Sequence, residues 1–242
     1  MNLLLLSAED MASANRACFS GRRAGHINKV LKLKPGDSVK VGLINGTICV
    51  AHIRHIDATR VELELAPELE HKPPPPALPV TLVVALPRPK MLRRIIQTCA
   101  TLGVKRLHFI HSYRVEKSYW QTPLLSPDAI HENLLLGLEQ AGDTMLPEVS
   151  LHKRFKPFVE DQLTDIISDS QALVAHPTAS TLAPGAVNEA ITLVIGPEGG
   201  FIPYEIDKLV TAGCAPISLG PRILRVETAI PVLLSRLFAM HN

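Results

Sequence analysis

Two short apolar runs within residues 191–240 each end at a glycine–proline turn that leads into a helical pattern. Gly-Pro-Glu-Gly-Gly follows the run 191–195, and Gly-Pro-Arg follows the run 215–219. Turns of this kind stand at the carboxyl ends of strands, where open α/β sheets bind their ligands. Glycine lets a ligand approach the backbone, and the free N–H groups of a helix start point toward it. We therefore predict a ligand site built from these two turns.

The residues of the turns restrict the ligand. Neither turn carries the Lys-Ser/Thr pair of a phosphate-binding loop or the spaced glycines of a dinucleotide turn. The carboxylate of Glu198 repels a triphosphate but tolerates a neutral or cationic nucleoside, and S-adenosylmethionine fits that description. The alternative is that both segments are ordinary tight turns that bind no ligand, because glycine and proline are common turn residues.

Two longer segments carry a resemblance to a known family. They are LVIGPEGGF at 193–201 and LGPRILRVETA at 219–229. Both resemble the signature segments of the ribosomal RNA small subunit methyltransferase E family, which belongs to the SPOUT, or α/β-knot, superfamily. The resemblance implies methyl transfer from S-adenosylmethionine to N3 of a uridine in 16S rRNA. It also implies a trefoil knot in the C-terminal part of the chain, a rare exception to ordinary connection rules.

The pattern of residues 77–242 predicts an α/β domain. The segment 80–86 is continuously apolar, as strands buried on both faces of a parallel sheet are. Short apolar runs and helical patterns then alternate, which indicates a mainly parallel sheet with helices on both faces. We expect further strands at 106–111, 149–152, 171–175, 191–195 and 215–219, and helices at 90–102, 126–141, 157–168, 202–213 and 229–240.

The pattern of residues 1–70 differs. After a first strand at 2–6, the segment 38–65 alternates apolar and polar residues, with a hairpin signal at Asn45-Gly46 and a break at 57–59. This predicts a small antiparallel barrel, which the resemblance identifies as a PUA-like RNA-binding domain. Four prolines at 73–76 make 71–76 a semi-rigid linker. The domains are therefore expected at 1–70 and 77–242.

Charge is concentrated near the N-terminus. Residues 1–40 hold seven Lys or Arg against three acids, a net +4, whereas the whole chain has +2. A basic segment on a balanced chain suggests contact with a polyanion, and a solvated surface face is the alternative. We predict that these residues contact RNA phosphates: Arg22, Arg23, His26, Lys29, Lys32 and Lys34.

In SPOUT enzymes three loops enclose the cofactor, and the first corresponds here to the strand end at His176, where only the position after a strand matches. His176 also fits an ordinary loop residue. The residues expected to bind S-adenosylmethionine are Val174, His176, Ile195, Gly196, Pro197, Glu198, Gly199, Gly200, Leu219, Gly220, Ile223, Leu224 and Arg225.

The reaction implied by the resemblance predicts a catalytic arginine. Uridine N3 must lose its proton, and a guanidinium beside O2 or O4 stabilises the anion. Arg225 is the first candidate because it lies in the second signature segment, and Arg222 is the second. Glu227 either orients Arg225 or caps the last helix. The four cysteines are scattered without CxxC spacing, so no metal site is predicted.

Four positions depart from the family pattern and bear on RNA recognition. The family usually has lysine and glutamate near Thr98 and Thr101, and arginine at Lys117 and Asp143. Losing a guanidinium for a carboxylate changes any phosphate contact made there.

Three further expectations concern the oligomeric state, the cellular location and the RNA substrate. The apolar residues of 229–240 cover more than one helical face, which favours a homodimer. No run is long enough to span a membrane, so we expect a cytoplasmic protein that acts on 16S rRNA or the small ribosomal subunit. Two other functions stay open: a ribose 2′-oxygen or tRNA-base methyltransferase of the same superfamily, and an RNA-binding protein without catalysis.

Overall fold

The computed structural model describes residues 2–238, which form two compact units. One unit contains the chain up to Pro76 together with Leu135–Leu146, and the other contains the rest. The return of 135–146 to the first unit was not predicted. It is held there by the backbone N–H groups of Asn2 and Leu3, which donate to the Glu139 carbonyl at 2.9 and 3.1 Å.

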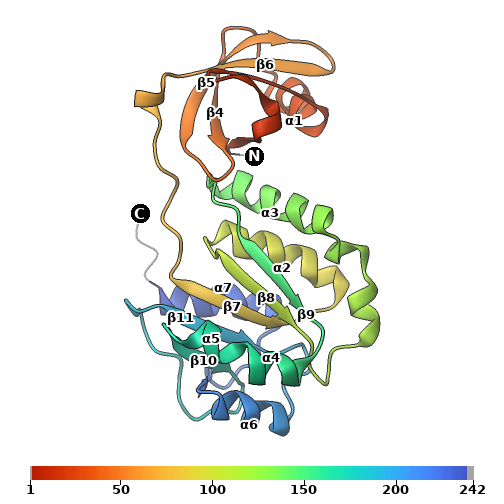
Figure 1. The fold of residues 1–242 in the computed structure, drawn as a ribbon, viewed down its shortest axis with the longest axis vertical. Helices are drawn as coiled ribbons and strands as arrows, with labels where there is room; N and C mark the ends of the chain where they lie inside the picture. Colours follow the sequence, from red (N-terminus) through yellow and green to blue (C-terminus); the bar gives the residue numbers. More distant parts are fainter. Residues whose placement is uncertain (1, 239–242) are drawn as a thin grey trace. The chain divides into compact units, whose positions relative to one another are not determined.

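The first unit is a curved six-stranded sheet in the order β1-β4-β5-β6-β3-β2 (Figure 1). Its strands are β1 (Leu4–Leu6), β2 (Met11–Ser13), β3 (Arg16–Ser20), β4 (Ser38–Leu43), β5 (Ile48–Ile56) and β6 (Arg60–Leu65). The hairpin at Asn45-Gly46 is confirmed, with Asn45 at φ 59°. The antiparallel pairing expected within 38–65 is confirmed for β4, β5 and β6, and β1 adds a parallel pair with β4.

Residues 7–34 contain structure that the sequence pattern did not indicate. The strands β2 and β3 form a short hairpin, and α1 (Gly21–His26) continues directly into one turn of π-helix (Ile27–Leu31). Lys32 ends this helix in the left-handed region at φ 52°. The core between helix and sheet holds apolar side chains with at most 5% exposure, among them Leu4, Phe19, Ile27, Val41, Ile53 and Leu63.

The second unit confirms the α/β class. Its sheet has the order β12-β10-β11-β7-β8-β9, and every pair is parallel. The strands are β7 (Val80–Ala85), β8 (Arg106–Ile110), β9 (Glu148–His152), β10 (Gln171–Ala175), β11 (Ile191–Ile195) and β12 (Ala215–Ile217). All residues of the central strands β7 and β11 are buried, as continuous apolar runs predict.

Helices cover both faces of this sheet (Figure 1). They are α2 (Pro89–Thr101), α4 (Phe155–Asp161), α5 (Leu163–Ile167), α6 (Pro203–Thr211) and α7 (Val226–Leu237), and α3 (Pro127–Ala141) belongs to this unit up to Leu134. The single helix predicted at 157–168 was wrong in two ways. It begins two residues earlier, since proline is tolerated in the first turn, and it breaks into α4 and α5 at Gln162.

The connection between β10 and β11 crosses over the C-terminal elements. Ala183 N–H donates to the Ser218 carbonyl at 2.8 Å, and Val187 N–H donates to the Leu237 carbonyl at 2.7 Å. The connection therefore touches both the end of β12 and the end of α7, the segments that the expected knot involves. The knot itself stays a prediction. Across residues 2–238, no helix combines the length and apolar character that a membrane span needs.

Candidate functional site

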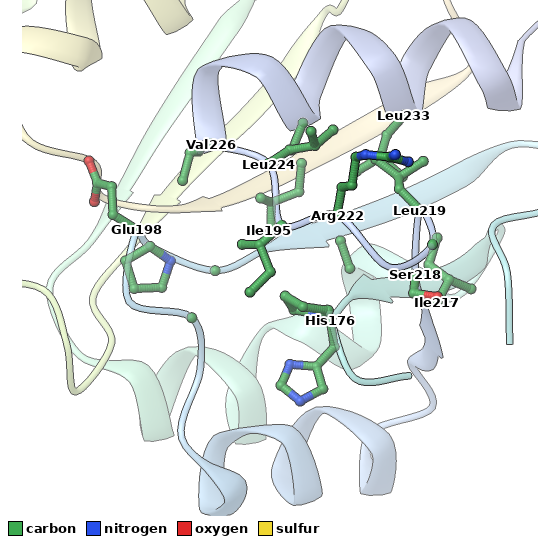
Figure 2. A pocket seen from close by; sticks show the side chains of 18 residues that line it. His176, Ile195, Glu198, Ile217, Ser218, Leu219, Arg222, Leu224, Val226 and Leu233 are labelled. Carbon is green, nitrogen blue, oxygen red and sulfur yellow. The ribbon is translucent and has the colours of Figure 1, made fainter. Parts of the chain in front are cut away.

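A cavity lies where the strands β10, β11 and β12 reach their carboxyl ends. It is lined by residues of the three loops that follow these strands and by α7: Ala175, His176, Pro177, Ile195, Gly196, Pro197, Glu198, Gly200, Ile217, Ser218, Leu219, Gly220, Arg222, Ile223, Leu224, Val226, Ala229 and Leu233. In Figure 2, Leu224, Val226 and Leu233 lie on the side of α7, and His176 lies opposite. The structure thus brings the three predicted loops together.

The first glycine turn has no room for larger residues. A Cβ atom added at Gly196 would lie 3.1 Å from the Phe201 nitrogen and 3.2 Å from its ring. Gly200 has φ 72°, and its N–H donates to the Pro197 carbonyl at 2.7 Å. Glycine is therefore required at 200 for its backbone conformation and at 196 for close packing.

This turn is also fixed from outside the cavity. The Glu198 carboxylate accepts the backbone N–H of Arg88, which precedes α2, at 3.1 Å. The Arg114 guanidinium donates to the Gly199 carbonyl. Gly199 faces Arg114 and does not line the cavity, unlike the other residues of the predicted turn.

The second turn has backbone donors without acceptors at the cavity wall. Within residues 2–238, the N–H groups of Leu219 and Leu224 have no hydrogen-bond acceptor, although both residues line the cavity. Gly220 has φ 102°, a conformation that other residues rarely adopt. Free N–H groups beside apolar side chains suit a flat, polar-edged ring.

His176 contributes an unpaired polar atom. Its N–H donates to the Ile217 carbonyl at 2.8 Å, whereas its Nδ1 is buried without a partner among residues 2–238. A buried polar atom without a partner is costly, so a ligand group that reaches it gains binding energy.

The two candidate arginines differ in position. Both are exposed, but Arg222 lines the cavity, whereas Arg225 precedes α7 and is not part of the wall. The Arg225 carbonyl accepts the N–H groups of Thr228 and Ala229. Glu227 lies in the first turn of α7, and Val174 is fully buried in β10, so neither lines the cavity.

The predicted RNA-binding residues of the first unit divide into two groups. Arg22 donates twice to the buried Glu139 carboxylate, at 2.9 and 3.0 Å, and Arg23 donates twice to Asp10, at 2.6 and 2.7 Å. Burial raises the pKa of Asp10, but the bonds from Arg23 and Ser7 outweigh it and lower the pKa below its ordinary value. In contrast, Lys29, Lys32 and Lys34 are exposed, and His26 is half-buried.

The departures from the family pattern have local explanations. Asp143 is buried at 3% exposure and accepts the Met145 N–H at 2.9 Å, so this carboxylate stabilises the chain that follows α3. The Thr101 hydroxyl donates to the Gln97 carbonyl within α2, and Thr98 is half-buried on the same helix. Lys117 is exposed on the loop after β8.

The sequence analysis missed a carboxylate that supports the site. Glu205 in α6 is 2% exposed and accepts two backbone N–H groups, from Tyr113 at 2.7 Å and from Ile202 at 3.0 Å. It joins the loop after β8 to the segment after the first glycine turn. The only signal in the sequence is the proline start of α6, with an acid in its first turn. In the described part of the chain, no three His, Cys, Asp or Glu side chains are placed to hold a metal ion.

Comparison with known proteins assigns the chain to a family. A family model described as an RNA methyltransferase domain matches residues 74–238, and one described as an RNA methyltransferase PUA domain matches residues 19–66. The ribosomal RNA small subunit methyltransferase E of Treponema pallidum is 32% identical over 235 residues, which cover 95% of this chain and 87% of the relative. The chain belongs to the ribosomal RNA small subunit methyltransferase E family. The Synechocystis member is 30% identical over 222 residues, covering 89% of this chain and 70% of that relative.

The fold agrees with this family. The crystal structure of the Neisseria gonorrhoeae ribosomal RNA small subunit methyltransferase E, which is bound to S-adenosylmethionine, matches with a TM-score of 0.75 at 20% identity. The match covers 97% of this chain and 95% of that one. The expected PUA-like unit and the parallel-sheet unit are therefore both confirmed. The family models and the Treponema relative show that the chain is an RNA methyltransferase.

Proposed function

We propose that this methyltransferase binds S-adenosylmethionine in the cavity at the carboxyl ends of β10, β11 and β12 and methylates N3 of a uridine in 16S rRNA. The observation that carries the proposal is the cavity itself, with two glycine turns, apolar walls and unpaired backbone donors. The Treponema relative, named for the small-subunit RNA, supports the substrate. That substrate also favours a cytoplasmic location.

The residues present fit this cofactor. Ile195, Leu219 and Leu224 offer apolar faces for an adenine, and the N–H groups of Leu219 and Leu224 can donate to its edge. Lysine is absent from the lining, as a ligand without a triphosphate requires, and Glu198 is the charge complementary to a sulfonium. His176 Nδ1 offers one more polar contact.

The bound cofactor supplies an electrophilic methyl group. The chain must position the uridine N3 atom in line with that group, exclude water and stabilise the charge that N3 acquires on losing its proton. A uridine paired through N3 cannot react, so the base must be unpaired or flipped out.

An arginine is the residue suited to that charge. The anion spreads onto two carbonyl oxygens, which a guanidinium can bind with a fork of donors. We propose Arg225 in this role, with Arg222 as the alternative. Arg225 lies outside the cavity wall, where an incoming base arrives, whereas Arg222 belongs to the wall beside the cofactor.

We also propose a homodimer formed through α7. The predicted pattern included Met240, which lies outside the described residues. Val232 is 41% exposed on α7, and Ile223 and Leu182, on neighbouring loops, are 79% and 59% exposed. A groove between α7 and the second turn is lined by Leu219, Pro221, Arg222, Leu224, Pro231, Val232, Ser235 and Arg236. A second copy is the simplest cover for this apolar surface.

Two measurements test the proposed function. In calorimetry, Gly196→Val should abolish S-adenosylmethionine binding because its side chain fills the turn, whereas Gly185→Ala, where an added Cβ meets nothing within 4 Å, should bind normally. In a transfer assay, methyl label should enter 16S rRNA of small subunits and should not enter tRNA. Cofactor binding without transfer to any RNA would favour a binding protein without catalysis.

A further inference from the structure

Three segments that follow neighbouring strands lie at one edge of the parallel sheet. In the order β11-β7-β8, Ile195 is aligned with Val84, and Ala85 is aligned with Ile110. Because parallel strands end at the same edge, the chain after each of these strands emerges beside the next. The loop after β8 therefore emerges two strands from the first glycine turn, with β7 between them, and four strands from the cavity's second turn, which follows β12. Arg114 of this loop nevertheless reaches the Gly199 carbonyl of the first turn.

This loop is fixed in place by its backbone. Tyr113 N–H donates to Glu205 Oε1 at 2.7 Å, and the other oxygen of this buried carboxylate accepts Ile202 N–H at 3.0 Å. Hydrogen bonds to a buried carboxylate are among the stronger ones in proteins. The neighbouring Ser112 and Val115 are buried at 0% and 4% exposure.

The side chain of Tyr113 is nevertheless turned to solvent. It is 77% exposed, and its hydroxyl has no hydrogen-bond partner among residues 2–238. A rigid backbone that presents an exposed aromatic ring loses little entropy when the ring binds a partner.

Exposed cations lie on the same loop as Tyr113 and on the segment joined to the first glycine turn. Arg114 donates to the Gly199 carbonyl of the glycine turn, and Arg88 is joined to the same turn through its backbone N–H and Glu198. Lys117 follows on the same loop, and all three cations are exposed. Aromatic rings beside cations are the surface that proteins use to bind single-stranded nucleic acid.

We propose that Tyr113, Arg88, Arg114 and Lys117 form a platform for the RNA strand beside the methylated uridine, with Tyr113 stacked on an unpaired nucleobase. The proposal rests on the proposed function and adds a substrate contact in the catalytic unit. Extruding a uridine breaks its stacking with neighbouring bases, and an aromatic ring replaces part of that loss. The three cations contact phosphates of the same strand.

Substitutions at Tyr113 test the stacking. Relative to the parent, Tyr113→Ala should lower kcat/KM for small-subunit methylation by about 10- to 100-fold, the range expected for one stacked base. Tyr113→Phe should retain most activity, and Tyr113→Leu, which keeps apolar bulk without a π-face, should not. The S-adenosylmethionine Kd from calorimetry should be unchanged in all three.

The charges are tested by salt dependence. Arg88→Gln with Lys117→Gln should weaken binding of 16S rRNA and reduce the slope of log K against log salt by about one for each phosphate that the variant no longer neutralises. Lys156→Gln is the matched control, because Lys156 is an exposed lysine 3.9 Å from Glu160 on α4.

Equal kcat/KM and RNA affinity for Tyr113→Ala and the parent would overturn the platform, and so would equal activity of the Leu and Phe variants. If the parent itself transfers no methyl to RNA, the proposed function fails. RNA affinity of the Tyr113 variants then still decides whether the platform binds the strand.

Discussion

Arginines of the two units are used differently. In the N-terminal unit, Arg22 and Arg23 each donate two hydrogen bonds to a buried carboxylate of the same unit. In the parallel-sheet unit, Arg88 and Arg225 are exposed, and neither side chain makes an ion pair with another residue of 2–238.

The difference teaches that a basic stretch of sequence does not by itself locate an RNA surface. Arg22 and Arg23 belong to the stretch with the largest charge excess, yet they neutralise carboxylates that would otherwise be buried alone. Exposed cations such as Arg88 lie outside that stretch, among residues 41–242, whose charges together sum to −2. The partner of each side chain, rather than the local sum of charges, decides what is left for a substrate.

The largest expected effect distinguishes a catalytic arginine from a structural one. Arg225→Ala should lower the single-turnover methylation rate about 100-fold or more at neutral pH, with little change in cofactor affinity or melting temperature. Arg225→Lys should rescue only partly, and higher pH should help the alanine variant because hydroxide then supplies the anion. A near-normal rate for Arg225→Ala would assign the role to Arg222, for which the same series is the comparison.

Removal of Arg22 should affect folding more than RNA binding. Arg22→Ala leaves the Glu139 carboxylate, whose side chain is 3% exposed, without its ion pair, so the free energy of unfolding should fall by about 2–3 kcal/mol. Chemical denaturation measures this loss. Lys34→Ala, at an exposed lysine, is the control and should change stability by less than about 0.5 kcal/mol. If Arg22→Ala and Lys34→Ala are equally stable, the ion pair between Arg22 and Glu139 does not contribute to folding, and Arg22 does not differ from an exposed lysine.

The units should also differ in their response to acid. Burial, followed by the charges of His152 and Arg106, lowers the pKa of His108 to about 4, and burial lowers the pKa of His152 as well. Unfolding raises the pKa of His108 to its ordinary value of 6.5, so the unfolded chain binds more protons between pH 6.5 and pH 4. The stability of the parallel-sheet unit should therefore fall across this window.

The lowered pKa of Asp10 acts at lower pH. The stability from its ionised form is present above the ordinary value of 3.8 and is lost as the pH falls through the lower folded value.

A pH titration of stability measures the contribution of His108. From pH 7 to pH 5 the free energy of unfolding of the parallel-sheet unit should fall by about 1–2 kcal/mol, an amount already reduced for the partial exposure of His108. Trp120, the single tryptophan, reports this unit by fluorescence. His108→Gln should flatten the dependence, and an unchanged slope would contradict the assignment.

The smallest effects are expected for the exposed lysines of the N-terminal unit. Removing one charge, in Lys29→Gln, Lys32→Gln or Lys34→Gln, should weaken RNA binding a few-fold and reduce the salt slope by about one, without changing which uridine is modified. Filter binding at several salt concentrations gives both quantities. If the three lysine variants bind like the parent, these lysines are only a solvated face.

The sequence predicted local features best. Gly103 and Gly142 end helices at φ 81° and 74°, and the apolar strands β7 and β11 lie in the sheet centre, because backbone conformation and burial follow from residue type. Contacts distant in sequence could not be predicted. Arg22 and Glu139 are 117 positions apart, and no short-range pattern links them.

The candidate site shows the same limit. Both glycine turns were evident from their residues, and the structure brings them to one cavity. Arg222 and Arg225 stand three positions apart in an irregular loop, where the fold alone decides which side chain lines the wall. The role of Glu205 depends on the loop after β8, which comes next to α6 only through the strand order.

The position of the methyl group tests the central claim most directly. Small subunits that lack the modification would be incubated with the protein and S-adenosylmethionine, digested to nucleosides and separated by mass spectrometry against authentic standards. We expect 3-methyluridine with the parent protein and none with Gly196→Val. A methyl group on a ribose 2′-oxygen, or no methylated nucleoside from 16S rRNA, would contradict the account.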